Sequence, residues 1–356
     1  MEENTLIAKL EADIKYLNEF EKNRPHQDFG DWEARFKSET AKLLNNDLTI
    51  NTCNLRNFRG LQIFVSDWPC AKLKNFYHDS KLWFSFKHFI NHFLGTQRGG
   101  IQEAMDGFKT IEEKKYIHWL DKYPSPEIGR PLHVHYRQYR FTRRYLWNIY
   151  LFALSIESLG KKLEDAFIGM DIGCSYGTFS SLLKQAYPQS RHILVDMPGQ
   201  LILAHYYLAN FFPDAKIAGF SEVGEAKKID REFVKKYDFV LLPTSMYSMI
   251  QADTVDFVTN FASLTEMSRE WFDSYLTSPA FKSAQFFFTV NRYDASPTYQ
   301  SGITILDYPL KEYEPILMGT CPIFPCYYLR KFIFFNKRVM YPSQFFQFIG
   351  RRNGKN

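Results

Sequence analysis

Two aspartates stand where short apolar segments end, at a spacing that suits one shared ligand site. Asp171 lies within the apolar run Ile168–Ile172, and Asp196 directly follows His192–Val195. Either acid alone has a simpler explanation as a turn residue or a helix cap, because Asp is common in turns. Asp196, however, stands roughly twenty residues after a glycine turn, where an α/β nucleotide site places a ribose-binding carboxylate. Together the two acids predict a site for a hydroxyl-rich or cationic ligand.

The glycine turn Gly173-Cys174-Ser175-Tyr176-Gly177 lies between the first apolar run and a helical pattern, Thr178–Ala186. Strand, glycine turn and helix in this order are typical of a nucleotide site in an open α/β sheet. Glycines allow a ligand to approach the backbone, and the first N–H groups of the helix remain as donors. The turn lacks the three glycines of the dinucleotide fingerprint, which disfavours a nicotinamide-dependent oxidoreductase.

Apolar runs alternate with helical patterns after residue 165, which predicts an α/β fold with a parallel sheet. The strands are expected at Ile168–Ile172, His192–Val195, Lys216–Gly219, Phe239–Leu242 and Phe286–Val290. Late strands are expected near Ile316–Thr320 and Tyr327–Phe335, and helices over Arg137–Leu159 and Thr259–Tyr275. Ligands in such sheets bind beyond the carboxyl ends of the strands.

Several motifs carry a family resemblance. The segment Asp171–Gly177 resembles the first motif of class I methyltransferases, which use S-adenosylmethionine. Further segments resemble the sugar O-methyltransferases of that class: Val195-Asp196-Met197-Pro198, Ala204–Leu208, Phe212-Pro213, Ser263–Met267 and Asn291-Arg292. The resemblance covers about residues 125–335. It implies a Rossmann-like, mostly parallel seven-stranded sheet with an antiparallel last strand, and methyl transfer from S-adenosylmethionine to a sugar hydroxyl in polysaccharide or glycoconjugate synthesis.

The resemblance and the strand ends together give a set of candidate site residues. Cofactor-binding residues are expected to be Asp171, Gly173, Ser175, Tyr176, Gly177, Asp196, Met197, Pro243 and Thr244. The candidate general base is Glu266, with His133 and His135 as alternatives. The acceptor is expected to contact Asn291, Arg292, Tyr247 and Arg137. No carboxylate cluster demands a metal ion, and no metal ligand is predicted.

The same residues also allow other acceptors and other roles. A phenol or polyketide hydroxyl is one alternative acceptor, and a non-catalytic module that binds a glycan or a partner is an alternative role. The basic residues Arg137, Arg140, Arg143 and Arg144 are typical of a solvated helix face, with phosphate contact as the next interpretation. A net charge of +5 is mild and does not indicate nucleic-acid binding. Leu242-Pro243-Thr244-Ser245 also lacks the Asn/Asp-Pro-Pro-Tyr motif of amino-methylating DNA enzymes.

Composition and segment boundaries suggest how the chain is organised. Residues 1–125 are expected to form a mainly helical accessory domain, 126–164 a connector and helix, 165–340 the methyltransferase domain, and 341–356 a basic tail. The apolar stripe of residues 3–22 favours packing on its own domain, and a homodimer is the alternative. The five cysteines are irregularly spaced, and no apolar run forms a signal core or a membrane span. A cytoplasmic protein without stable membrane insertion is therefore expected.

Overall fold

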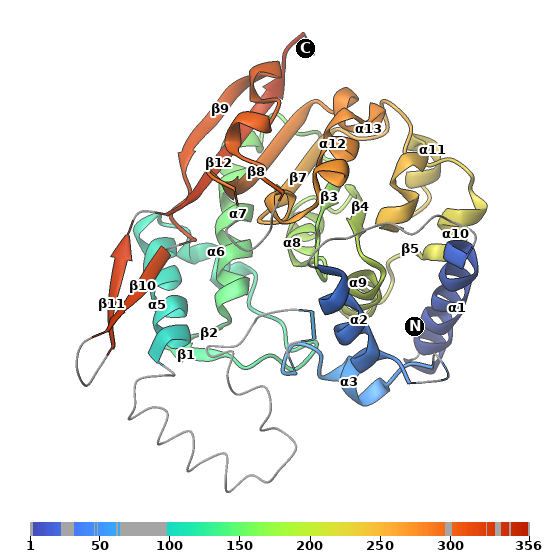
Figure 1. The fold of residues 1–356 in the computed structure, drawn as a ribbon, viewed down its shortest axis with the longest axis horizontal. Helices are drawn as coiled ribbons and strands as arrows, with labels where there is room; N and C mark the ends of the chain where they lie inside the picture. Colours follow the sequence, from blue (N-terminus) through green and yellow to red (C-terminus); the bar gives the residue numbers. More distant parts are fainter. Residues whose placement is uncertain are drawn as a thin grey trace, which may run out of the picture.

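A large mixed sheet runs through the centre of the molecule (Figure 1). The computed structural model describes residues 3–22, 32–64, 98–295 and 301–354, apart from 46, 48, 62, 325, 332–335 and 342. Listed in order across the sheet, the strands are β5 (Ile217–Ala218), β6 (Phe239–Pro243), β4 (Arg191–Asp196), β3 (Ile168–Ile172), β7 (Phe257–Phe261), β8 (Phe286–Arg292), β12 (Phe345–Arg352) and β9 (Tyr313–Thr320).

The strand directions confirm the expected fold class. Neighbours from β5 to β8 run parallel, whereas β12 runs antiparallel to both β8 and β9. A parallel sheet with one reversed strand, the last in the sequence, is the Rossmann-like arrangement of class I methyltransferases. Within the described residues the sheet has eight strands where seven were expected. The strand predicted at Lys216–Gly219 is present as the short β5, whereas β7 and β12 were not among the predicted strands.

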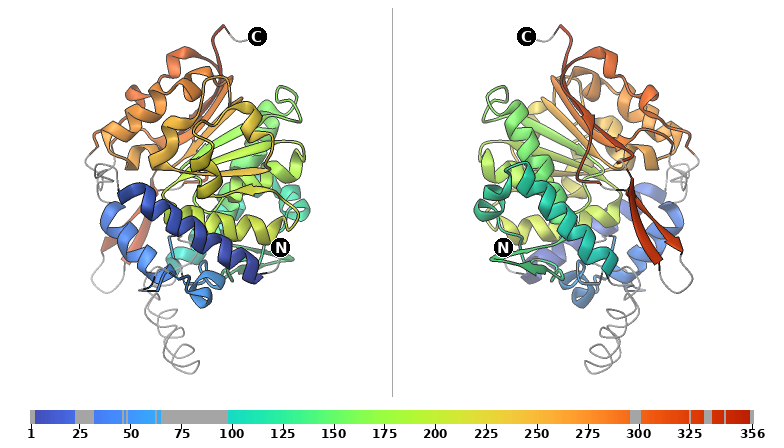
Figure 2. Two further views of the ribbon diagram at one scale, coloured as in Figure 1. Left: turned by 90° about the vertical axis from the view of Figure 1, so that its right-hand side faces the viewer. Right: turned by 90° about the vertical axis from the view of Figure 1, so that its left-hand side faces the viewer.

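Helices cover both faces of the sheet, as the two side views in Figure 2 show. One face packs against a layer formed by α1 (Glu3–Lys22), α2 (Trp32–Leu43), α3 (Thr52–Arg56), α9 (Pro198–Phe211), α10 (Phe220–Glu225), α11 (Arg231–Val234), α12 (Arg269–Thr277) and α13 (Pro279–Ser283). The other face packs against α5 (Arg98–Glu113), α6 (Ile117–Lys122), α7 (Arg143–Leu159) and α8 (Thr178–Ala186). The buried apolar residues accordingly form two clusters, one on each side of the sheet.

The N-terminal helices belong to these same layers. Leu6, Leu10, Ile14 and Leu17 of α1 are buried in the cluster that also contains β4 and α9. The apolar stripe of α1 therefore packs on its own chain, as the sequence favoured. Helix α5 packs on α7 in the opposite layer. The aromatic-rich stretch at 65–97 lies outside the described residues.

Helix α7 begins at Arg143, later than predicted. A two-stranded hairpin, β1 (Val134–Tyr136) with β2 (Tyr139–Phe141), occupies the preceding residues. Arg137 lies in its turn with φ +51°, which a helix does not allow. The Thr142 hydroxyl accepts the Tyr145 N–H at 3.1 Å and caps the helix.

The helix predicted over Thr259–Tyr275 is wrong in its first half. Strand β7 lies there beside β3, followed by a 3₁₀ turn over Leu264–Glu266 and then by α12. Asn260 and Thr259 are polar but buried, because they bond to groups of β3 and its neighbours. The polar pair interrupts the apolar run by which the other strands were recognised.

The basic tail predicted for residues 341–356 is also wrong. Residues 345–350 are buried in β12, between β8 and β9. Arg352 at its end donates to Glu312 at 2.7 Å and to the carbonyl oxygen of Phe281 at 3.1 Å. The late strand expected near Tyr327–Phe335 falls in a separate hairpin, β10 (Cys326–Lys331) with β11 (Asn336–Tyr341), rather than in the large sheet.

We expect Phe346→Ala in β12 to lower the free energy of unfolding by about 3–5 kcal/mol, the usual cost of emptying a buried aromatic site. Phe346 is fully buried, with its ring centroid 5.2 Å from that of Tyr308. Met318→Ala on β9 is the control, since Met318 is 59% exposed, and should change stability by less than about 0.5 kcal/mol. Equal urea-denaturation midpoints for Phe346→Ala and Met318→Ala would contradict the burial of β12.

Candidate active site

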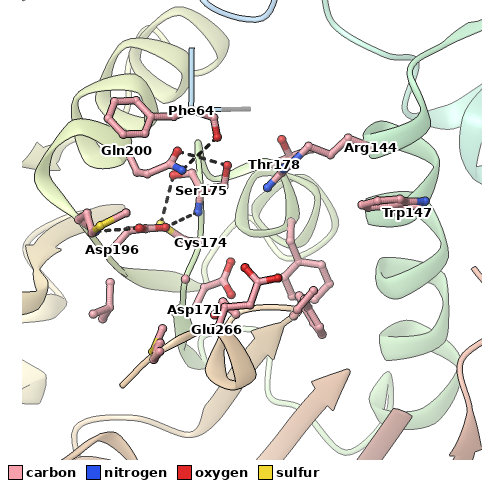
Figure 3. Close-up of a pocket in the computed structure, with 18 of the residues that line it drawn as sticks. Phe64, Arg144, Trp147, Asp171, Cys174, Ser175, Thr178, Asp196, Gln200 and Glu266 are labelled. Atoms are coloured by element: carbon pink, nitrogen blue, oxygen red, sulfur yellow. Dashed lines mark hydrogen bonds between the residues drawn. The ribbon is translucent and has the colours of Figure 1, made fainter. Parts of the chain in front are cut away.

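A cavity of about 410 Å³ opens at the carboxyl edge of the sheet (Figure 3). The ends of β3, β4, β6 and β7 contribute to its lining, together with Phe345 at the start of β12 and the first turns of α7. Phe345 faces this edge because β12 runs opposite to β8 and pairs Phe345 with Arg292 at the end of β8. The antiparallel strand β12 thus contributes its first residue to the site, whereas the parallel strands contribute their last residues.

The glycine turn lines the cavity in a conformation that requires its small residues. Gly173 and Gly177 have φ values of +74° and +80°, and Ser175 has +55°. A Cβ atom on Gly173 would lie 2.1 Å from the Ser263 hydroxyl, and one on Gly177 would lie 2.8 Å from Leu194. The glycines therefore permit both a left-handed backbone and a close approach of neighbouring elements.

The Asp196 carboxylate joins the end of β4 to this turn. One oxygen accepts the Ser175 N–H and the other accepts the Met197 N–H, each at 2.7 Å. Burial raises the pKa of Asp196 to about 6, although both hydrogen bonds act in the opposite direction. A carboxylate has more acceptor positions than these two bonds use, so Asp196 can still accept hydroxyl donors from a ligand.

Asp171 is the second acid of the cavity. It is 5% exposed, and its carboxylate accepts the Thr259 hydroxyl at 2.9 Å. Burial raises its pKa to about 7, with a further contribution from the charge of Asp196. A bound cation would favour the ionised form, so Asp171 suits an ammonium group.

Beneath the turn, the Asn260 side chain connects three neighbouring strands. Its amide N–H groups donate to the carbonyl oxygen of Ile172 at 2.7 Å and to the Ser263 hydroxyl at 2.6 Å. Its amide oxygen accepts the Asn291 side chain at 2.7 Å. Asn291 is fully buried within this network and does not line the cavity, so the structure does not support its predicted acceptor contact.

Most of the predicted cofactor-binding residues meet at the cavity. Those that line it are Asp171, Gly173, Ser175, Asp196, Met197 and Thr244. Three others do not line it: Tyr176, Gly177 and Pro243. The Tyr176 ring instead packs against Phe58 and Tyr207, and supports the turn from behind.

Among the candidate bases, the structure brings only Glu266 to the cavity, and Figure 3 shows its side chain beside Asp171. His133 hydrogen-bonds to the Ser125 hydroxyl at 3.0 Å, and His135 is exposed on β1. Neither histidine lines the cavity: His133 directly precedes the hairpin β1–β2, and His135 lies on its first strand.

The other predicted acceptor residues also lie elsewhere. Arg137 pairs with Glu112 at 2.6 Å, and the Tyr247 hydroxyl bonds to Ser278 at 2.7 Å. The Arg292 guanidinium lies 5.0 Å from the centre of the Phe345 ring, outside the cavity lining. None of the four predicted acceptor residues therefore lines the cavity. Asn291 and Arg292 were chosen for their place at a strand end, which does not determine where a side chain points.

Aromatic side chains that were not predicted form one wall of the cavity. They are Trp147, Phe179, Phe261, Phe324 and Phe345. On α7, the spacing of Arg144, Trp147 and Leu151 is that of one helix face and is a usable sequence signal. Phe324 and Phe345 carry no such signal, because they reach the cavity through the order of the sheet.

The N-terminal region also reaches the site. Phe64 lines the cavity, and its carbonyl oxygen accepts the Gln200 side-chain amide at 3.2 Å. Within the described ranges, no three His, Cys, Asp or Glu side chains are grouped as a metal site would need. None of the helices described there combines the length and apolarity that crossing a membrane requires.

Comparisons with known proteins give distant structural matches only. No protein-family profile and no curated protein matches the sequence. TehB from Haemophilus influenzae is 12% identical with a TM-score of 0.36, over 56% of this chain and 62% of TehB. The mitomycin 7-O-methyltransferase MmcR is 12% identical with a TM-score of 0.32, over 59% of this chain and 57% of MmcR.

A third match is the precorrin-6y C5,15-methyltransferase from Geobacter metallireducens, at 12% identity and a TM-score of 0.30. That match covers 57% of this chain and 88% of the other protein. The chain thus spans less than two thirds of TehB and of MmcR.

Gly173→Ala should lower the free energy of unfolding by about 1–3 kcal/mol, the cost of holding a residue with a side chain in the left-handed region. The new methyl group would also displace Ser263. Gly319→Ala on β9 is the matched control, because nothing lies within 4 Å of a Cβ there. Similar urea midpoints for the two variants would show that the turn tolerates a side chain.

Proposed function

We propose that this protein is an S-adenosylmethionine-dependent O-methyltransferase. The observation that carries the proposal is the placement of Asp171 and Asp196 on either side of a glycine turn, in one cavity at the carboxyl edge of the sheet. The sheet order and its single reversed strand are those of class I methyltransferases. The motif that resembles the first motif of that class forms the floor of the cavity.

The residues present fit this cofactor. Asp196 has acceptor capacity left for the two ribose hydroxyls, and Asp171 suits the ammonium group of the amino-acid portion. Met197, Thr244 and Tyr275 line the cavity beyond Asp196, where the adenine base would lie. The volume of about 410 Å³ lies within the usual range for small-ligand sites.

When bound, the cofactor supplies an electrophilic methyl group. The chain itself must align the acceptor hydroxyl with that group and remove the hydroxyl proton. Glu266 is the cavity carboxylate that we assign to the proton, since Asp171 and Asp196 are committed to the cofactor. Phe261 and Phe345, together with the rest of the aromatic wall, exclude water from the same space.

A sugar hydroxyl is the acceptor that we propose, in polysaccharide or glycoconjugate synthesis. The segment Ser263–Met267, which resembles the sugar O-methyltransferases, contributes Ser263, Glu266 and Met267 to the cavity. A phenolic acceptor is the second candidate, because the wall of five aromatic side chains also suits a flat apolar ring. A panel of sugar and phenol acceptors with labelled S-adenosylmethionine separates the two.

Nucleic acid is not a proposed acceptor. Strand β3 lies between β4 and β7, and β7 is its neighbour on the side away from β4. The segment to compare with amino-methylating DNA enzymes is therefore Asn260-Phe261-Ala262-Ser263 after β7, rather than Leu242-Pro243-Thr244-Ser245. That segment has no proline pair. The proposal therefore concerns a small hydroxyl acceptor, with S-adenosylmethionine as the only cofactor.

The proposal is tested by calorimetric titration with S-adenosylhomocysteine, the product form of the cofactor. Asp196→Ala should weaken its binding about 10- to 100-fold, the range expected for lost hydrogen bonds to a charged group. Asp196→Asn keeps the shape of the side chain, so it distinguishes the loss of the negative charge from a structural change in the turn. Asp214→Ala, at an exposed position outside the cavity, is the control.

Two results would overturn the proposal. One is the absence of S-adenosylhomocysteine binding to folded protein purified free of ligand. The other is unchanged binding in both Asp196 variants. A glycan that binds tightly without any cofactor affinity would instead favour the non-catalytic binding module.

Glu266→Gln should lower kcat about 10²- to 10⁴-fold, the usual contribution of a general base. Its affinity for S-adenosylhomocysteine should remain unchanged, since the amide preserves the shape of the side chain. Glu270→Gln, at an exposed position on α12, is the control. The assay uses the best acceptor from the panel, and an unchanged kcat would remove Glu266 from the role of base.

A further inference from the structure

Arg144 and Thr178 meet where α7 and α8 pack together above the glycine turn. Both residues line the cavity, and the two helices are in contact. The Arg144 guanidinium lies 5.8 Å from the centre of the Tyr176 ring, two residues before Thr178. Figure 3 shows the Arg144 side chain extending from α7 toward the start of α8.

Arg144 differs from its neighbour Arg143 in its partners. Arg143 pairs with Glu103 and stacks over Trp147 at 4.7 Å. The Arg144 main chain accepts the Asn148 side-chain amide at 2.9 Å. Its guanidinium lies over the Tyr176 ring and, within the described residues, makes no ion pair and no hydrogen bond. Its charge acts on Asp196 through space, but the hydrogen bonds recorded for that carboxylate come from backbone N–H groups. A half-buried guanidinium is strongly stabilised when a carboxylate or phosphate accepts its N–H groups in pairs.

Thr178 supplies an independent observation at the same place. It is 4% exposed, and its hydroxyl has no hydrogen-bond partner among the residues described. A buried hydroxyl without a partner is costly, so a ligand that bonds to it gains affinity. Thr178 is also the first residue of the nine-residue helix α8, whose leading N–H groups favour negative charge.

We propose that Arg144 and Thr178 form an anion subsite of the cavity, which takes a carboxylate or a phosphate group of a bound molecule. The guanidinium supplies charge and paired N–H donors, and the hydroxyl and the start of α8 complete the cradle. The acids Asp171, Asp196 and Glu266 repel an anion from the rest of the cavity. The negative group is therefore confined to this end.

Two molecules could bring that group into the cavity. One is the cofactor, through the carboxylate of its amino-acid portion, and the other is a phosphorylated acceptor. The choice of source rests on the proposed function, whereas the subsite itself can be tested with an anion alone. A mild positive net charge of +5 is consistent with an anionic ligand.

The test compares wild-type protein with Arg144→Gln and Arg144→Lys, and uses Arg140→Gln as the matched control. Arg140 is exposed on β2, pairs with Glu127 and does not line the cavity. The probes in calorimetry are inorganic phosphate, S-adenosylhomocysteine and 5′-methylthioadenosine, which lacks the amino-acid portion. Glucose 6-phosphate and glucose are then titrated into protein saturated with S-adenosylhomocysteine.

Arg144→Gln should weaken binding of the anionic probe about 10- to 100-fold, with partial recovery in Arg144→Lys. A loss for S-adenosylhomocysteine but not for 5′-methylthioadenosine would assign the subsite to the cofactor carboxylate. A loss for glucose 6-phosphate but not for glucose would assign it to the acceptor. Thr178→Val should weaken the same probe less, and Thr178→Ser should retain binding.

Equal loss for 5′-methylthioadenosine and S-adenosylhomocysteine would overturn the proposal, because Arg144 would then only support the fold of the site. Unchanged binding of every anionic probe in Arg144→Gln would overturn it as well. If wild-type protein binds no S-adenosylhomocysteine, the proposed function fails. The subsite is then decided by inorganic phosphate alone, and equal phosphate binding, or none, in wild type and Arg144→Gln rejects it.

Discussion

The buried amide of Asn260 is the interaction on which the geometry of the site depends. Its hydrogen bonds reach the last carbonyl group of β3, the Ser263 hydroxyl after β7 and the Asn291 side chain of β8. The side chain is fully buried, and a polar group without a hydrogen-bond partner in such surroundings costs considerable folding free energy. The ends of three adjacent strands are thereby held in one register, and the glycine turn begins from that fixed base.

This network also divides the polar residues of the sheet edge into two groups. Below the turn, the Asn291 side-chain amide donates to the Asn260 amide oxygen, whereas Asp171, Asp196 and Glu266 line the cavity above it. The adenosine portion of the cofactor that we propose lies toward β4 and β6, and the acceptor lies toward the aromatic residues of α7 and β12. The glycine turn stands between them, so one rigid element can position both reactants.

The sequence predicted the parts of the fold that depend on local pattern. Ile168–Ile172 was predicted with its observed bounds, because a short apolar run before glycines has few other interpretations. Strand β7 was missed because Thr259 and Asn260 are polar, and their burial depends on partners in another strand. Strand β12 was missed despite its apolar residues, because its neighbouring arginines suggested a solvated tail.

The same division holds for the site. The turn and its two acids could be predicted from residues close together in the sequence, and six of the nine predicted cofactor residues line the cavity. The aromatic wall and the acceptor contacts arise from α7, Phe324 and β12, which come together only through long-range packing. Arg144 was grouped with Arg137 and Arg140 as one basic face. Arg137 and Arg140 instead belong to the hairpin β1–β2 and do not line the cavity, whereas Arg144 does.

The interior position of β12 has a consequence for how the chain is made. On the ribosome, β9 emerges before the strand that joins it to the rest of the sheet, since β12 pairs with both β8 and β9. Until residues 345–352 have been synthesised, β9 has no place in the sheet, and the edge of β8 stays open to pairing with other chains. Completion of this sheet therefore waits for residues 345–352 and does not follow the order of synthesis strand by strand.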